Sequence, residues 1–213
     1  MNRRIKKPHR LIAAVSLVLI LAAAPTPAGE GGAADPGSRT DVATFAGGCF
    51  WCMEADFEKI EGVISATSGY TGGHVPYPTY KEVSAGGTGH AESIRVDFDP
   101  SRVSYAELLE AFWHGIDPTM ADRQFCDVGD QYRSAIFVHD AAQRAAAEGS
   151  RAELERTKVL AAPIVTEITE ASTFYPAEEY HQDYAKNHPL KYRYYRRGCG
   201  RDRRLEELWG DKK

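Results

Sequence analysis

The chain has 213 residues, of which 43% are hydrophobic and 26% are charged, a composition ordinary for a globular domain with a sizeable core. Five of its 26 Lys and Arg residues lie in residues 1–28, so the rest of the chain holds 21 basic residues against 30 acidic ones, a formal charge of about −9. That charge argues against nucleic acid and anionic membranes as partners, because both attract basic surfaces.

The first 28 residues have the order of a secretory signal peptide. The basic segment MNRRIKKPHR precedes the apolar run LIAAVSLVLILAAA, and the small residues Thr26 and Ala28 follow at cleavage positions. The run is short for a bilayer span, so an uncleaved membrane anchor is the second interpretation. We expect export to a periplasmic or extracellular compartment, a flexible lead-in over residues 29–40 and a single catalytic domain over residues 41–213.

Apolar spacing and turn residues predict alternating strands and helices along that domain. In chain order we expect a strand over 41–47, a helix over 50–60, a strand over 62–73, a loop over 73–92, a strand over 92–100, a helix from Ser104 to Ile116, a loop over 117–132, a strand over 133–140, a helix over 141–158, a strand over 162–170, a helix over 177–188, a basic and aromatic tail over 189–202 and a helix over 203–209. The pattern favours an α+β fold, a two-layer, ferredoxin-like sandwich of one mixed sheet with helices packed on it and long functional loops.

Cys49 stands where the first strand turns into the first helix. A helix N-terminus favours thiolate through its dipole and its free backbone N–H groups, and the preceding Gly-Gly pair allows a tight turn. Phe50 and Trp51 follow directly and suit the walls of a small apolar pocket, although core packing would use them equally. The position favours a nucleophile. Because export leads to an oxidising compartment, structural disulfides are the alternative for all four cysteines.

The spacing of Cys49 and Cys52 also fits two other kinds of site. A zinc knuckle needs four ligands, but Cys126 and Cys199 stand alone and no H-x-x-x-H pair accompanies them, so we predict no metal. A thioredoxin-like dithiol shares the order of strand, C-x-x-C and helix and is the better alternative.

Two polar loops add candidate side chains. His90 and Glu92 follow a Gly-rich segment, and as metal ligands they would form only a weak pair. Asp127 and Tyr132 belong to the loop FCDVGDQYRS, for which a solvated acidic surface is the alternative.

Six sequence blocks carry a family resemblance. In chain order they are GCFW (48–51), SGYTGG, PTY..V, TGHAE, D.G.QYRS and FYPAEEYHQDY (174–184). Together they resemble the A-type peptide methionine sulfoxide reductases, over about residues 41–188. The resemblance places five residues on that family's catalytic positions: Cys49, Tyr80, Glu92, Asp127 and Tyr132.

The resemblance implies a role for each of these side chains. Cys49 would attack the sulfur of an S-epimer methionine sulfoxide and become a sulfenic acid. Glu92, if burial keeps it protonated, would donate a proton to the sulfoxide oxygen, and Tyr80 and Tyr132 would donate hydrogen bonds to it. Asp127 would orient the loop and neighbouring polar groups.

The aromatic residues Phe50 and Trp51 would pack around the S-methyl group of the substrate. The resemblance further implies no bound cofactor and a thioredoxin-like external dithiol as reductant. We expect a monomer that repairs oxidised proteins and also reduces free methionine sulfoxide.

A second thiol must resolve the sulfenic acid as a disulfide. Cys199 is preferred because it lies in a Gly-flanked tail, Cys52 is second because it is nearest in sequence, and Cys126 adjoins Asp127. Two other functions remain open. One is a periplasmic dithiol oxidoreductase that acts through Cys49 and Cys52, and the other is a binding module stapled by disulfides.

Overall fold

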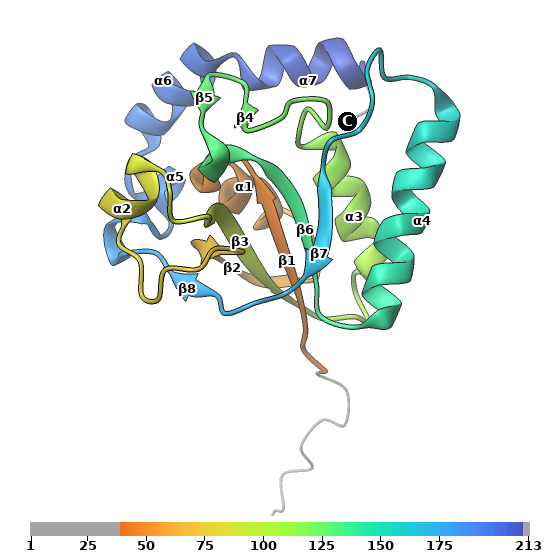
Figure 1. The fold of residues 1–213 in the computed structure, drawn as a ribbon, viewed down its shortest axis with the longest axis horizontal. Helices are drawn as coiled ribbons and strands as arrows, with labels where there is room; N and C mark the ends of the chain where they lie inside the picture. Colours follow the sequence, from red (N-terminus) through yellow and green to blue (C-terminus); the bar gives the residue numbers. More distant parts are fainter. Residues whose placement is uncertain (1–38, 211–213) are drawn as a thin grey trace, which may run out of the picture. The chain divides into compact units, whose positions relative to one another are not determined.

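The computed structural model describes residues 39–210, and the predicted signal peptide and nearly all of the lead-in lie outside them. A six-stranded sheet in this part of the chain has the order β7-β6-β1-β3-β2-β8 (Figure 1). Its strands are β1 (Asp41–Gly47), β2 (Val63–Thr71), β3 (Ala91–Phe98), β6 (Ser134–Val138), β7 (Glu167–Glu170) and β8 (Tyr175–Pro176). Neighbours are antiparallel except for the parallel pair β6 and β7, so the predicted mixed sheet is confirmed.

Three helices cover one face of this sheet: α1 (Phe50–Phe57), α3 (Tyr105–His114) and α4 (Ala141–Thr157) (Figure 1). The chain order β1-α1-β2-β3-α3-β6 and the spatial order β6-β1-β3-β2 are those of the ferredoxin-like plait, which confirms the predicted α+β sandwich. Phe45 of β1 lies with its ring centroid 5.1 Å from that of Phe112 on α3 and 5.3 Å from that of Phe57 on α1. Burial of each such ring contributes about 1.5–3 kcal/mol.

Short elements frame the end of the sheet where β1 meets α1. They are α2 (Tyr80–Ala85), the hairpin of β4 (Arg123–Gln124) and β5 (Asp127–Val128), the 3₁₀ turns η1 (Asp130–Tyr132) and η2 (Glu179–His181), and α5 (Tyr184–Asn187). The expected helix over 177–188 is wrong as one element, because Asp183 adopts a left-handed φ of 51° and divides it. The expected loop over 73–92 contains α2, whose N-cap Thr79 forms a capping box with Glu82.

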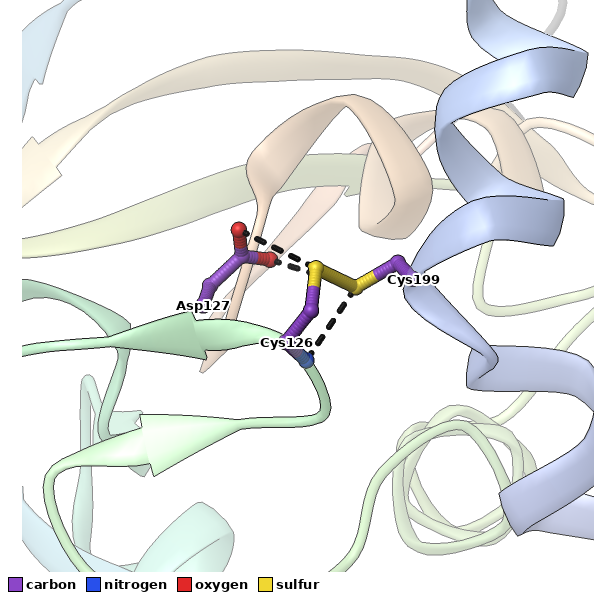
Figure 2. Close-up of side chains that lie close together, drawn as sticks. All are labelled: Cys126, Asp127 and Cys199. Carbon is purple, nitrogen blue, oxygen red and sulfur yellow. Dashed lines mark hydrogen bonds between the residues drawn. A yellow bond between two sulfur atoms is a disulfide. The ribbon is translucent and has the colours of Figure 1, made fainter.

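The C-terminal segment is helical where a tail was expected. Helix α6 (Pro189–Cys199) begins with proline at its first position, and α7 (Arg201–Trp209) follows after Gly200, which has a left-handed φ of 75°. A disulfide joins Cys199 at the end of α6 to Cys126 in the β4–β5 hairpin (Figure 2). The segment is therefore packed on the domain. None of the helices within residues 39–210 has the length and apolar character needed to cross a bilayer.

Candidate active site

Cys49 is the N-cap of α1, at the predicted turn from strand to helix. Its carbonyl oxygen accepts the backbone N–H of Cys52 at 3.1 Å and so begins the helix. Gly48 makes the turn with a φ of +80°, and a Cβ there would lie 2.5 Å from the Cβ of Gln124. The glycine thus lets the β4 strand approach the nucleophile closely.

A cavity of about 90 Å³ opens beside the Cys49 sulfur. Its lining residues come from six elements of the fold: Cys49, Phe50, Trp51, Tyr80, Glu92, Asp127, Tyr132 and Tyr195. All five residues predicted to be catalytic and both predicted to bind substrate therefore line one cavity. Tyr195 is the lining residue that the sequence did not indicate.

Glu92 lies within β3 with 2% of its surface exposed. Burial raises the pKa of its carboxyl to about 8, although a hydrogen bond from the Phe50 backbone N–H, 3.1 Å from Oε2, opposes the shift. Asp127 and Cys52 raise it further through their negative charges. A carboxyl with this pKa is protonated at neutral pH and has a proton to donate.

Two tyrosine hydroxyls share the cavity with Glu92. Burial raises the pKa of Tyr80 to about 12 and raises that of Tyr132 as well, so both keep their protons as hydrogen-bond donors. The backbone N–H of Tyr80 donates to Glu178 Oε1 at 2.8 Å, and the hydroxyl of Tyr70 donates to Glu178 Oε2 at 2.9 Å. Glu178 thereby fixes the start of α2 against β2.

The aromatic wall of the cavity is held from behind by the segment around α5. The ring of Trp51 stacks on Tyr184 with centroids 3.7 Å apart, and its Nε1–H donates to His181 Nδ1 at 3.1 Å. His181 also lies 5.0 Å from Phe50 between ring centroids. These contacts orient both predicted substrate-binding side chains. His181 lies within the FYPAEEYHQDY block, but its supporting role was not predicted.

Asp127 and Tyr195 close the cavity on the side of α6. The Tyr195 hydroxyl donates to Asp127 Oδ2 at 2.5 Å, and it also faces Cys49, where it opposes the rise in pKa that burial causes in the thiol. Burial raises the pKa of Asp127 against that hydrogen bond. Tyr195 precedes Cys199 by four residues, so in a helix the two side chains lie on the same face. This spacing would have predicted that Tyr195 lies near the site if the segment had been expected to be helical.

The four cysteines form two pairs. Cys126 and Cys199 form the disulfide, with Cα atoms 5.0 Å apart, so Cys199 is joined to Cys126 and not to Cys49. Both sulfurs lie against Asp127, whose carboxylate oxygens are 3.7 Å from Cys126 Sγ and 3.9 Å from Cys199 Sγ (Figure 2). Cys49 and Cys52 are free and buried, with 6% and 2% of their surfaces exposed.

The two free thiols act on each other. A hydrogen bond from Cys49, together with the positive charges of Arg201 and Arg196, lowers the pKa of Cys52 to about 7 against the opposing effect of burial. Burial, followed by the Cys52 contact, raises the pKa of Cys49. At pH 7 about half of the molecules therefore carry one negative charge on this pair, with one proton remaining.

A thiol pair, a protonated carboxyl and two tyrosine hydroxyls around a small aromatic cavity define a thiol-dependent oxidoreductase. The family model of peptide methionine sulfoxide reductase matches residues 41–213, and the chain belongs to this family. The resemblance seen in the sequence blocks is thereby confirmed.

Several relatives are similar over nearly their whole length. Peptide methionine sulfoxide reductase MsrA of Bacillus licheniformis is 50% identical over 174 residues, which cover 82% of this chain and 96% of the relative. MsrA 2 of Caulobacter vibrioides is 47% identical over 194 residues, or 91% and 98% of the two chains. Among solved structures, reduced Mxr1 of Saccharomyces cerevisiae has a TM-score of 0.67 at 32% identity, covering 73% of this chain and 89% of that one. Methionine sulfoxide reductase A of Corynebacterium diphtheriae has a TM-score of 0.64 at 34% identity, covering 74% and 78%.

Proposed function

We propose that this protein reduces methionine S-sulfoxide, free and in proteins, to methionine. The observation that carries this function is the cavity in which the Cys49 sulfur meets the Glu92 carboxyl and the hydroxyls of Tyr80 and Tyr132. A sulfoxide in this cavity offers its sulfur to a nucleophile and its oxygen to three donors. The choice of the S epimer rests on membership of the family.

In the first step the Cys49 thiol passes its proton to the Cys52 thiolate, and the Cys49 sulfur attacks the sulfoxide sulfur. Glu92 gives a proton to the sulfoxide oxygen, which develops negative charge, and the tyrosine hydroxyls hold that charge by hydrogen bonds. The oxygen ends on Cys49 as a sulfenic acid, and the substrate leaves as methionine, reduced by two electrons. Phe50 and Trp51 supply apolar contacts for the S-methyl group.

In the second step Cys52 resolves the sulfenic acid. Its thiol attacks the Cys49 sulfur, a disulfide forms, and the hydroxyl leaves with a proton as water. The backbone N–H of Cys52 donates to the Cys49 carbonyl oxygen at 3.1 Å, and the two thiols share a hydrogen bond, so their sulfurs lie close together. We therefore place Cys52 before Cys199, the thiol preferred from the sequence, because Cys199 is bonded to Cys126.

The Cys126–Cys199 pair is the route by which an external dithiol of the thioredoxin kind regenerates the enzyme. Cys126 is exposed and Cys199 half-buried, whereas Cys49 and Cys52 are both buried and less accessible to another protein's thiol. The reductant takes the exposed disulfide to two thiols, and these reduce the Cys49–Cys52 disulfide by exchange and become a disulfide again. The burial of Cys49 and Cys52, here called the inner pair, also argues against protein disulfides as their substrate.

The enzyme would act outside the cytoplasm, as a secreted or periplasmic protein. The N-terminal sequence supports export to an oxidising compartment. After cleavage the protein would act as a monomer without a bound cofactor. Its reductant would be a thioredoxin-like protein of that compartment or a thiol relayed across the membrane.

The test is a single turnover of the protein without residues 1–28. With the Cys126–Cys199 disulfide intact and Cys49 and Cys52 reduced, excess S-epimer methionine sulfoxide is added without reductant. We expect one methionine per chain and a Cys49–Cys52 disulfide in the peptide map. No methionine, with both inner thiols unchanged, would reject the function, and insulin reduction without sulfoxide turnover would indicate a dithiol oxidoreductase instead.

A further inference from the structure

Arg201 is a buried arginine for which neither the fold nor the reaction yet accounts. It begins α7 in the segment GCGRD, and 1% of its surface is exposed. Its guanidinium donates to the carbonyl oxygens of Gly47 at 3.2 Å and Gly115 at 2.6 Å, and it lies 4.8 Å from the ring centroid of Phe125. Its Nε is buried without a hydrogen-bond partner.

The charge of this guanidinium is uncompensated by any salt bridge to a carboxylate within residues 39–210. Arg196, which is also largely buried, differs because it pairs with Asp56 at 2.8 Å and Asp202 at 2.7 Å. A buried cation without an anion carries a large desolvation penalty, and two carbonyl dipoles offset only part of it. The surroundings of Arg201 therefore call for an anion.

The first turn of α1 supplies one. Arg201 Nη1 donates to the Gly47 carbonyl oxygen just before this turn, and Arg201 Nη2 lies 3.0 Å from Met53 Sδ within it, so the guanidinium lies against the turn that carries Cys52. Cys52 is the neighbour of Met53 and is itself buried. Asp127 also feels the charge of Arg201, but its carboxylate is already held by the Tyr195 hydroxyl at 2.5 Å.

Charged and titratable groups reach Cys52 from four elements: Cys49 and Asp56 on α1, Glu92 on β3, Tyr192 and Arg196 on α6, and Arg201 on α7. Asp56, Glu92 and Tyr192 disfavour a thiolate when they are ionised, so the cations must offset them. Arg196 shares its charge with two carboxylates. Arg201 forms no salt bridge within residues 39–210, so it is the cation whose charge can stabilise the Cys52 thiolate.

We propose that Arg201 is a positioning residue for the reaction, acting as the counter-charge that keeps Cys52 as a thiolate in the resting enzyme. The thiolate then accepts the proton of Cys49 when the nucleophile attacks. This inference rests on the proposed function for its meaning, but the ionisation of Cys52 is measured without turnover.

The test follows the thiolate absorbance near 240 nm against pH in a Cys49→Ser protein. The Cys126–Cys199 disulfide does not titrate, so Cys52 is the remaining thiol, and the serine hydroxyl replaces the Cys49 donor. We expect a midpoint near pH 7 that rises by about 1–2 pH units in Arg201→Gln, a roughly 5- to 50-fold loss of thiolate at pH 7. Arg201→Lys keeps the charge and restores much of the shift.

Arg204→Gln is the matched control. Arg204 lies on the same helix and pairs with Asp117 and Glu207, so its loss leaves the Cys52 midpoint unchanged. An unmoved midpoint in Arg201→Gln, or equal rises in Arg201→Gln and Arg201→Lys, would overturn the proposal. In the Cys49-containing enzyme, the pH at which methionine release reaches its plateau shifts upward with Arg201→Gln. Absence of methionine release in the unsubstituted enzyme would instead reject the function and leave the Cys52 titration interpretable.

If Arg201→Gln does not fold, a stability measurement tests whether Cys52 is a thiolate in the folded protein. Because the Cys52 pKa is lowered by folding, its thiolate stabilises the native state above the ordinary thiol pKa, and this stabilisation is lost as pH falls through about 7. We expect Cys49→Ser to be more stable than Cys49→Ser/Cys52→Ser at pH 9, with the difference diminishing at pH 6. A difference that does not change with pH would contradict the proposal.

Discussion

At the residue scale, Glu92 shows which of two opposing effects determines the state of an active-site carboxyl. A backbone N–H bond at 3.1 Å stabilises the carboxylate, whereas burial of a side chain that is 2% exposed disfavours it. Burial wins, and the pKa rises to about 8. Within residues 39–210 the carboxylate accepts only one backbone N–H bond, and two or three such bonds would have kept it ionised. The raised pKa therefore depends on the small number of donors as well as on burial.

Replacement of Glu92 by Gln removes the transferable proton and keeps the shape. We expect the rate of methionine release to fall about 10²–10⁴-fold, the range for loss of a general acid. In the unsubstituted enzyme the rate should fall as pH rises through about 8, because Glu92 then loses its proton, and this alkaline limb should be absent in Glu92→Gln. Rapid-quench measurement of methionine from pH 6 to 10 tests both expectations. An alkaline limb that persists in the variant would assign it to another group.

Tyr195 gives a second prediction at this scale. In Tyr195→Phe the Asp127 carboxylate loses the hydroxyl that donates at 2.5 Å, so the pKa of Asp127 rises further. A hydrogen bond to a charged group contributes about 1.5–3 kcal/mol. We expect kcat/KM to fall about tenfold and the acid limb of its pH profile to move upward. Tyr194→Phe is the control, because that side chain is 85% exposed, and a profile identical in both variants would refute the role.

At the scale of elements, the turn between β1 and α1 depends on a glycine that a larger residue cannot replace. Gly48→Ala would place a Cβ 2.5 Å from Gln124 in a left-handed backbone conformation, and we expect a loss of about 1–3 kcal/mol in unfolding free energy together with lower activity. Gly149→Ala is the matched change, because Gly149 lies inside α4 with nothing within 4 Å of an added Cβ. It should stabilise the protein by about 0.5–1 kcal/mol. Urea denaturation compares the two, and equal effects would contradict this account.

The same scale shows how far the sequence predicts the structure. The strands β1, β2, β3 and β6 and the helices α1, α3 and α4 were predictable because their apolar residues recur at strand or helix spacing, and Ser104 marks the start of α3 with a capping box to Glu107. Helix α6 was not, because aromatic and basic residues on a packed helix resemble a solvated tail until a tertiary contact, here the Cys126–Cys199 disulfide, holds it.

Some residues of the site were also predictable from the sequence, and others were not. Its residues in motif blocks, such as Cys49 and Glu92, were predictable from family resemblance. Tyr195 and Arg201 were not, because their roles depend on where α6 and α7 pack, and no local pattern specifies that packing.

At the scale of the whole molecule, the inner pair (Cys49 and Cys52) and the outer pair (Cys126 and Cys199) together determine how many electrons one chain can store. If the outer pair feeds the inner pair, a chain with all four thiols reduced holds four electrons, and each sulfoxide consumes two. We expect two methionines per fully reduced chain, and one when the Cys126–Cys199 disulfide is intact.

Quantitative methionine analysis without external reductant makes this distinction, and Cys126→Ser/Cys199→Ser is the control that should yield one methionine in either preparation. In that variant turnover with a small reductant such as dithiothreitol should continue, whereas turnover with a thioredoxin-like protein should fall at least tenfold, because the buried Cys49–Cys52 disulfide is less accessible to it. One methionine from the fully reduced natural sequence would show that the outer disulfide is structural. The external dithiol would then have to reach the Cys49–Cys52 disulfide directly, through the cavity that Asp127 and Tyr195 line on the side of α6.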